Sequence, residues 1–289
     1  MALILAQDSF NRTSAAGSWG AADTGGVWTL TGGNSQFLVD PGWGRVSLQP
    51  SYDRAAYLNG VLSANAVIRV AMSSSSAYVG SAQNFTIVGR KISSAYYQAR
   101  VRIENGLLRL YTMRDETALT GSTTISHAYA AGEVIWCELA VTGTNPTTVS
   151  AKMWLDGDVE PGSYQQSTTD STPGYQTVGV IGLRANIGAS AASAIMSFGN
   201  YSATDPTTNV LDTPVVVLQQ AAPTTIGGSD GSITATWTAV SGADHYESQL
   251  VAGAVTSGFT ADDTNAVSPK TYSGLPAGAY TVAVRAKAN

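Results

Sequence analysis

The sequence predicts an all-β protein, and two observations carry that prediction. Segments in which apolar and polar residues alternate recur along most of the 289 residues, as they do in strands with one buried face. The composition also favours strands, because Ser, Thr, Val and Tyr fill these segments while 30 Gly and 10 Pro supply turns. No segment keeps a 3.6-residue period, so we expect no helix longer than a turn or two.

The expected strands fall into two series. The first comprises residues 65–72, 84–92, 95–103 and 106–113, and the second comprises 133–143, 147–155 and 177–185. Within the first series, Glu104-Asn105-Gly106 predicts a tight hairpin, because Asn-Gly accepts positive φ at both turn positions.

A change in composition near "SATDPTTNVLDTP", residues 202–214, predicts a boundary between two domains. Thr, Asp and Pro leave this segment little to bury, which is typical of a linker. We therefore expect a first domain at residues 1–205, a linker at 206–214 and a second domain at 215–289.

Charge and cysteine content exclude several classes of function. A net charge of −5 without a basic run argues against nucleic-acid binding, and two His with one Cys argue against a zinc site. Cys137 lies in the apolar run "EVIWCELAV" and is expected to be buried. No run of about 20 apolar residues predicts membrane insertion.

The first ten residues, "MALILAQDSF", lack the basic start and the long apolar run of a secretory signal. The composition is nevertheless that of an extracellular β protein. We expect either that a signal has been removed or that the protein leaves the cell another way, for instance in a virus particle released by lysis.

The second domain resembles a fibronectin type III module. The resemblance rests on "GSITATWTAVSGADHYESQLVAG" and "TYSGLPAGAYTVAVRAKAN", with Trp237, Tyr246, Leu275 and Tyr280 at the matching positions. It implies an Ig-like sandwich in which Trp237 and Leu275 fill the core and a Tyr makes a corner hydrogen bond. The family's last edge strand has no counterpart before Asn289, so the resemblance implies an open sheet edge.

The first domain resembles the concanavalin-like, laminin-G-like jelly-roll family over residues 6–204. The matching segments are "DSFNRTSAAGSWGAADTGGVWTLTGG" (8–33), "YYQARVRIENGLLRLYTM" (96–113) and the late strands of 134–183. Combined with the fibronectin-type partner, this domain resembles minor tail proteins of phages that infect actinobacteria. The resemblance implies a virion tail protein, homo-oligomeric and in contact with other tail proteins, whose sandwich binds carbohydrate on the host surface. The alternative is an extracellular carbohydrate-binding accessory module of a secreted bacterial enzyme.

Two sets of residues are candidates for sugar binding, because sugars bind aromatic faces flanked by hydrogen-bonding groups. In 95–103, alternation assigns Tyr97, Ala99, Val101 and Ile103 to the core. The opposite face, with two arginines of the next strand, carries Tyr96, Gln98, Arg100, Arg102, Arg109 and Arg114. The alternative interpretation of this set is an ordinary solvated sheet face.

The second set lies opposite the apolar face formed by Ile135, Cys137, Leu139 and Val141. It comprises Trp136, Glu138, Lys152 and Trp154. These residues line a sugar groove or, alternatively, the two tryptophans cover the core. Trp43 and Arg45 in "GWGRVSL" suggest a binding loop, although a packing turn is the favoured interpretation.

Three acidic residues, Asp156, Asp158 and Glu160, occupy every second position of "LDGDVEPG". Glycoside hydrolases use a pair of carboxylates, but the Asp-Gly and Pro-Gly dipeptides favour a turn over a calcium site, and a calcium site over catalysis. No nucleophile elbow, phosphate loop or dinucleotide fingerprint occurs, so we expect no enzymatic activity.

Calcium is the metal that the residue types favour, because oxygen ligands are plentiful. Asp8 and Asp205 are the candidate ligands, since they meet if the first and last strands of the domain pair. The alternative is two surface acids without a metal.

Overall fold

The computed structural model describes residues 2–209, 214–221, 228–240, 243–252 and 261–287. These residues form strands and a single 3-10 helix, η1 (Asn34–Gln36), so the all-β prediction is confirmed. No helix in this part of the chain is long and apolar enough to cross a membrane. The chain divides after Thr207 into two compact units.

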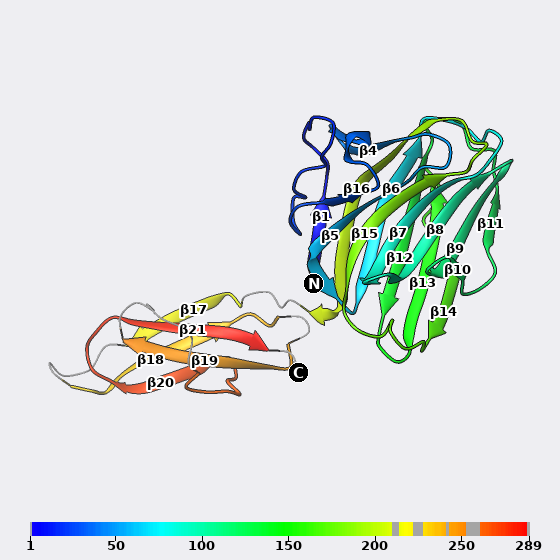
Figure 1. The fold of residues 1–289 in the computed structure, drawn as a ribbon. Helices are drawn as coiled ribbons and strands as arrows, with labels where there is room; N and C mark the ends of the chain where they lie inside the picture. The colour runs from blue at the N-terminus through cyan, green and yellow to red at the C-terminus, as the bar shows by residue number, and fades with distance from the viewer. Residues whose placement is uncertain (1, 210–213, 222–227, 241–242, 253–260, 288–289) are drawn as a thin grey trace. The chain divides into compact units, whose positions relative to one another are not determined.

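The first unit is a sandwich of two eight-stranded sheets, visible as two stacked layers in Figure 1. Sheet 1 contains, in spatial order, β14 (Gln166–Asp170), β13 (Thr147–Leu155), β12 (Val134–Thr142), β6 (Ala66–Ser74), β16 (Ala194–Asn209), β4 (Trp43–Leu48) and β3 (Phe37–Asp40), with β1 (Ala2–Asp8) paired to β16. Sheet 2 contains β10 (Thr117–Ala118), β9 (Leu107–Arg114), β8 (Ala95–Glu104), β7 (Gln83–Ile92), β15 (Gly179–Ile187), β5 (Asp53–Ser63) and β2 (Thr29–Thr31), with β11 (Thr123–Ser126) paired to β9.

The predicted hairpin joins β8 and β9, where Glu104 pairs with Leu107 across a two-residue turn. Only Gly106 has a positive φ, of 69°. The turn therefore uses the tolerance of positive φ at Gly106 alone, and the predicted hairpin is confirmed.

The core lies between the two sheets and follows the alternation in the sequence. All four inward residues predicted for β8 are fully buried, and so are the four predicted for β12: Tyr97, Ala99, Val101, Ile103, Ile135, Cys137, Leu139 and Val141. Burying the Val, Leu and Ile side chains among them contributes about 1.5–3 kcal/mol each. Sheet faces that point away from this core therefore carry the side chains available to ligands.

One irregularity in β7 changes which residue points inward. The register with β8 shifts between Val88 and Arg90, so Gly89 is an inserted position. A Cβ on Gly89 would come within 2.5 Å of a methyl group of Val141 in the opposite sheet. After this bulge Arg90 points into the sandwich, where its guanidinium donates to the Thr147 hydroxyl at 2.6 Å.

The second unit has a three-stranded sheet and a two-stranded sheet. The first contains β17 (Val216–Ala221), β18 (Gly231–Trp237) and β20 (Lys270–Leu275), and the second contains β19 (His245–Ala252) and β21 (Tyr280–Lys287). Trp237 is buried in its core, against which Tyr246 and Leu275 pack. The Tyr280 hydroxyl donates to the carbonyl of Pro276 at 3.0 Å, which agrees with the corner bond implied by the resemblance.

The predicted linker differs from the observed structure at its start. Strand β16 continues to Asn209, so residues 206–209 are strand, because a Thr-rich segment is compatible with an extended backbone. Residues 210–213 of the predicted linker lie outside the described residues.

Candidate functional site

The outward face of sheet 2 carries the first predicted ligand set, and an ion-pair network occupies it. Glu116 follows β9 and accepts hydrogen bonds from Arg100 at 2.6 Å and from Arg184 at 2.5 Å. The Tyr96 hydroxyl donates to the same carboxylate at 2.9 Å. Burial alone would raise the pKa of Glu116, but the two guanidinium groups lower it to about 2, so the carboxylate is ionised at neutral pH.

The other members of this set do not form the predicted surface. Gln98 is fully buried, because the turn after β9 covers it and its amide donates to the carbonyl of Asp115. Arg114 points toward the sandwich interior and pairs with Asp170 of β14 at 3.0 Å, since it lies five residues from Arg109 and so on the opposite side of the strand.

The two remaining arginines of the set share one carboxylate. Arg102 and Arg109 each contact one oxygen of Glu104 at 2.7 Å. Each arginine on this outward face therefore already contacts a carboxylate, and a ligand that bound there would have to compete with these contacts. A shallow depression of about 540 Å³ lies beside the network, next to Tyr57.

The outward face of sheet 1 carries the second predicted set, and here aromatic residues line up across the sheet. Trp154 pairs with Trp136, Trp136 with Ala71, and Ala71 with Gly199. The rings of Trp136 and Trp154 stack with centroids 6.2 Å apart and planes 10° apart. Neither tryptophan belongs to the core cluster between the two sheets, but Trp154 is buried, whereas Trp136 is half-buried.

Trp43 completes this row from the other side. Its ring lies against Gly199, where a Cβ would come within 3.0 Å of the indole, so the glycine lets the ring lie close to the sheet. The five residues Trp154, Trp136, Ala71, Gly199 and Trp43 are called the tryptophan row below. Because neighbouring strands lie about 4.8 Å apart, the Gly199 position under Trp43 is roughly 10 Å from Trp136.

Charged side chains border the tryptophan row on one side and pair with one another. The guanidinium of Arg69 lies 4.9 Å from the ring centroid of Trp136 and 4.8 Å from that of Trp154. It donates to Glu160 at 2.8 Å, and Lys152 reaches the same carboxylate at 2.6 Å. Lys152 also lies 3.5 Å from Glu138. These contacts hold the acidic connection after β13 over the sheet face.

The acidic connection is a turn, as predicted, although its acids have different partners. The amide of Asp158 donates to the carbonyl of Leu155 at 3.1 Å, and Gly157 has a φ of 90°. Asp156 accepts a hydrogen bond from the Trp136 indole at 2.7 Å, so it fixes one ring of the tryptophan row. Glu160 lies over the sheet face between Lys152 and Arg69.

Two carboxylates on this face, those of Glu138 and Glu160, share Lys152. The hydrogen bond from Lys152 lowers the pKa of Glu160, and Arg69 lowers it further. Glycoside hydrolysis needs one carboxylic acid that is protonated when the substrate binds. Glu160 is ionised instead, which does not suit the role of a general acid.

Asp8 is one of the two predicted calcium ligands. Its carboxylate oxygens already accept hydrogen bonds from four donor groups of the protein. Arg12 donates to both oxygens at 2.6 and 2.8 Å, the Trp28 indole donates at 2.7 Å and the Phe10 amide at 2.8 Å. Asp8 is 1 % exposed. These residues fit a buried ion pair and do not fit a calcium ion, because no lone pair of Asp8 faces an open ligand position.

Asp205, the other predicted ligand, accepts hydrogen bonds from the amide and hydroxyl of Thr207 at 2.8 and 2.6 Å. In the part of the chain that the structure describes, no three His, Cys, Asp or Glu residues gather at one place. Each aspartate thus makes its own local contacts.

Sequence reasoning missed the main feature of this face, which is the alignment of Trp43 with Trp136. Alternation places both side chains outward, but the residues between them come from β16 and β6, which are distant in sequence. Gly199 and Arg69 carried no signal of their own. Trp43 had been considered as a binding residue, yet only the sheet order brings it to the row.

No family model and no curated protein matches the sequence. Among solved structures, the CBM2 module of the evolved Dit of Lactobacillus casei BL23 phage J-1 is similar, with a TM-score of 0.46 and 11% identity over 72% of this chain and 98% of that module. The carbohydrate-binding module CBM66 from Bacillus subtilis has a TM-score of 0.41 and 12% identity over 62% of this chain and 95% of its own. A β-1,3-glucanase from Mycobacterium marinum has a TM-score of 0.42 and 13% identity over 69% of this chain and 98% of its own. Similarities at this level carry no argument about function, which rests on the geometry of the site.

Proposed function

We propose that the first unit is a carbohydrate-binding module without catalytic activity and that the tryptophan row is its binding surface. The observation that carries this proposal is the alignment of the half-buried indoles of Trp43 and Trp136 across one sheet face, with Ala71 and Gly199 between them. Trp154 is itself buried and supports the row by stacking on Trp136. Because Ala71 and Gly199 have no long side chain, nothing projects from these positions between the indoles, and a flat sugar ring can approach them.

The chemistry of the row suits a sugar. The apolar face of a sugar ring packs on an aromatic ring, while its hydroxyl groups need hydrogen-bonding partners around the edge. Ser73 and Ser197 border the row on one side and pair with each other across β6 and β16. Arg69, Glu138 and Lys152 border it on the other side. Donors and acceptors thus flank the indoles in both directions along the strands.

The charge state of two acids supports the proposed absence of catalysis. Glu160 is held ionised by Lys152 and Arg69, and Glu116 on the other sheet by Arg184 and Arg100. Neither residue suits the role of a protonated general acid. The module therefore retains its ligand and releases it unchanged.

Binding is tested with the full chain by affinity electrophoresis through gels that contain soluble polysaccharides, followed by calorimetry with the ligand that retards migration. Trp43→Ala and Trp136→Ala remove one indole each. The loss of one aromatic contact, about 1.4 kcal/mol, corresponds to a roughly 10-fold weaker Kd. Product analysis should find no shortened oligosaccharide.

Tyr57→Ala, on the outward face of sheet 2, is the matched control and should leave the Kd unchanged. If Tyr57→Ala abolishes binding while the two tryptophan variants bind normally, the binding face is sheet 2. If no polysaccharide retards the wild-type chain, carbohydrate binding itself is refuted. Thermal unfolding of each variant separates loss of binding from loss of folding.

The chain as a whole serves as a minor tail protein of a phage particle, with host-surface glycan and other tail proteins as partners. Support comes from the sequence resemblance of both domains, and from the shallow shape of the tryptophan row. A shallow site gives weak single contacts, which many homo-oligomeric copies on one particle would multiply. The alternative, an accessory module of a secreted enzyme, uses the same surface.

Antibodies raised against the chain distinguish the two assignments. Immunogold labelling of tails on purified phage particles supports the tail protein. Recovery of the antigen only as part of a larger secreted polypeptide with hydrolase activity supports the accessory module. Neither result affects the outcome of the carbohydrate-binding test, which is a separate measurement.

A further inference from the structure

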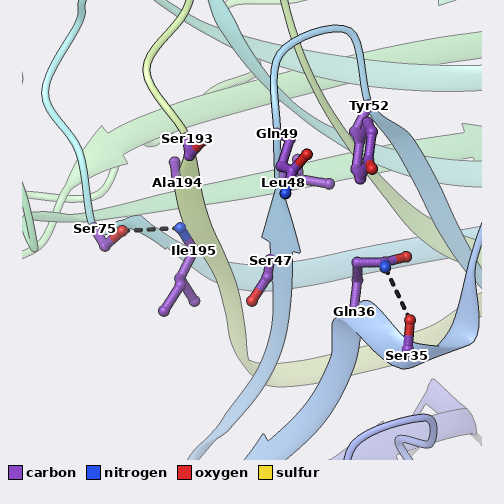
Figure 2. Close-up of a pocket in the computed structure, with 10 residues that line it drawn as sticks. All are labelled: Ser35, Gln36, Ser47, Leu48, Gln49, Tyr52, Ser75, Ser193, Ala194 and Ile195. Atoms are coloured by element: carbon purple, nitrogen blue, oxygen red, sulfur yellow. Dashed lines mark hydrogen bonds between the residues drawn. The ribbon is translucent and has the colours of Figure 1, made fainter.

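A pocket of about 430 Å³ opens on the same unit beyond the end of β4 (Figure 2). Three parts of the chain form it: η1, the end of β4 with the turn that follows, and the start of β16 beside Ser75. Its volume lies in the usual range for small-ligand sites, about 300–1,000 Å³. Among the ten residues drawn in Figure 2, none is charged.

The pocket offers neutral hydrogen-bonding groups that are not used within the described part of the chain. The hydroxyls of Ser47, Ser193 and Tyr52 and the side-chain amide of Gln49 make no hydrogen bond there. The Tyr52 ring supplies an aromatic surface, and the guanidinium of Arg54 lies 4.1 Å from its centroid. Hydroxyl and amide groups around an aromatic ring are the combination that binds an uncharged sugar.

The pocket continues toward the tryptophan row along one sheet face. Ile195 pairs with Ser47 and lines the pocket, and it also lines a second depression, of about 230 Å³, next to Trp43. Ser75 borders both hollows as well. Ser47 and Trp43 lie four residues apart on β4, which is roughly 14 Å along a strand. A linear ligand lying along β4 and β16 would touch both places.

The charges along this face leave no excess of either sign. Arg45 pairs with Asp40 at 2.7 Å, and Arg69 and Lys152 pair with Glu160 and Glu138. At the pocket Arg54 adds a fourth cation, whose guanidinium donates to Gln36, and at the row Asp156 adds a fourth carboxylate, which accepts from the Trp136 indole. An anionic glycan would therefore find no excess of cations here, and the net charge of −5 of the whole chain would repel it.

We propose that the pocket of Figure 2 binds one sugar unit of a neutral glycan whose adjoining units lie over Trp43 and the tryptophan row. This inference rests on the proposed function, and it adds both a second contact site and the charge class of the ligand. Affinity should therefore rise with oligosaccharide length until the chain spans from the row to the pocket.

Ser47→Phe tests the inference, because Ser47 is exposed on β4 and a phenyl group there fills the mouth of the pocket. Calorimetry on the full chain compares neutral gluco-, manno- and galacto-oligosaccharides of increasing length with oligogalacturonates. The wild-type chain should bind long neutral chains about 10-fold more tightly than short ones, and Ser47→Phe should remove that gain. Ser126→Phe, at an exposed serine of β11 in sheet 2, is the matched control.

The outcomes separate the pocket from the row. If Trp43→Ala weakens binding and Ser47→Phe does not, the pocket is refuted and the proposed function stands. A preference for oligogalacturonates that declines with salt would overturn the neutral ligand. If none of these oligosaccharides or polysaccharides binds the wild-type chain, the proposed function and the pocket fail together.

Discussion

Asp8→Ala removes a carboxylate that accepts four hydrogen bonds inside the first unit. Two of the bonds come from Arg12, one from the Trp28 indole and one from the Phe10 amide. Trp28 and Phe10 are buried, so their donors would be left without a partner and without water. Arg12 keeps the Trp19 carbonyl as an acceptor and reaches solvent, with a quarter of its side chain exposed.

The magnitude follows from these contacts. Breaking a buried ion pair by removing one partner costs about 3–5 kcal/mol, and each stranded buried donor costs about 1–3 kcal/mol. Because Arg12 regains part of its hydration, we expect Asp8→Ala to lower the free energy of unfolding by about 4 kcal/mol. For a unit of this size the midpoint of thermal unfolding should fall by roughly 8–16 °C. Asp8→Asn keeps the shape but turns one acceptor oxygen into an amide donor that faces two donors, so it should destabilise the unit as well.

The assay is thermal unfolding of the full chain, followed by tryptophan fluorescence and near-UV circular dichroism, with and without EDTA. Asp205→Ala is the control and should change stability by about 0.5 kcal/mol or less. EDTA should have no effect on the wild-type chain. A loss below about 1 kcal/mol in Asp8→Ala would refute the buried pair. A midpoint that falls with EDTA and is restored by calcium would support the metal instead.

Three further predictions concern the sandwich. The pKa of Glu116 is about 2 in the folded chain and about 4.3 when unfolded. The ionised carboxylate therefore adds about 1 kcal/mol, after allowance for solvent screening, to the free energy of unfolding above pH 4.5, and this contribution fades as the pH falls toward 2. In urea unfolding, Glu116→Gln should be as stable as the wild type near pH 2 and less stable at pH 7. Gly89→Ala places a Cβ 2.5 Å from Val141 and 2.9 Å from Leu139. This overpacking should lower the free energy of unfolding, measured by urea unfolding, by about 1–3 kcal/mol. An unchanged unfolding midpoint would contradict the inward position of the bulge. Cys137 is fully buried and burial raises its pKa, so Ellman's reagent should label it only in denaturant; rapid labelling of the native chain would contradict the core position of β12.

Alternation was sufficient to predict seven strands of the first unit and the inward faces of β8 and β12, because it depends only on neighbouring residues. It placed Trp136 and Trp154 outward, and both lie there. Their relation to Trp43 depends on the order β12, β6, β16, β4, in which no two neighbours are consecutive in sequence. Such an order is set by the packing of the whole domain, so local pattern cannot reveal it.

Ionic contacts were the least predictable part of both faces. Arg100 and Arg102 were correctly assigned to an outward face, but their partners Glu116 and Glu104 come from a turn and a strand end. Arg90 was read as part of a regular strand, and the inserted Gly89 turned it inward. A single inserted residue reverses every later side chain of a strand, which composition and spacing do not show.

The pairing of β1 with β16 joins the beginning of the first unit to its end. The same two regions meet in the core, where the ring centroids of Trp28 and Tyr201 lie 5.3 Å apart and those of Trp19 and Phe198 6.0 Å apart. During synthesis, the opening segment must wait for nearly two hundred later residues before its permanent neighbours leave the ribosome. Because contacts of such long range slow folding, the growing polypeptide leaves the rings of Trp19 and Trp28 exposed in that interval, and chaperones that bind apolar segments would find their target there.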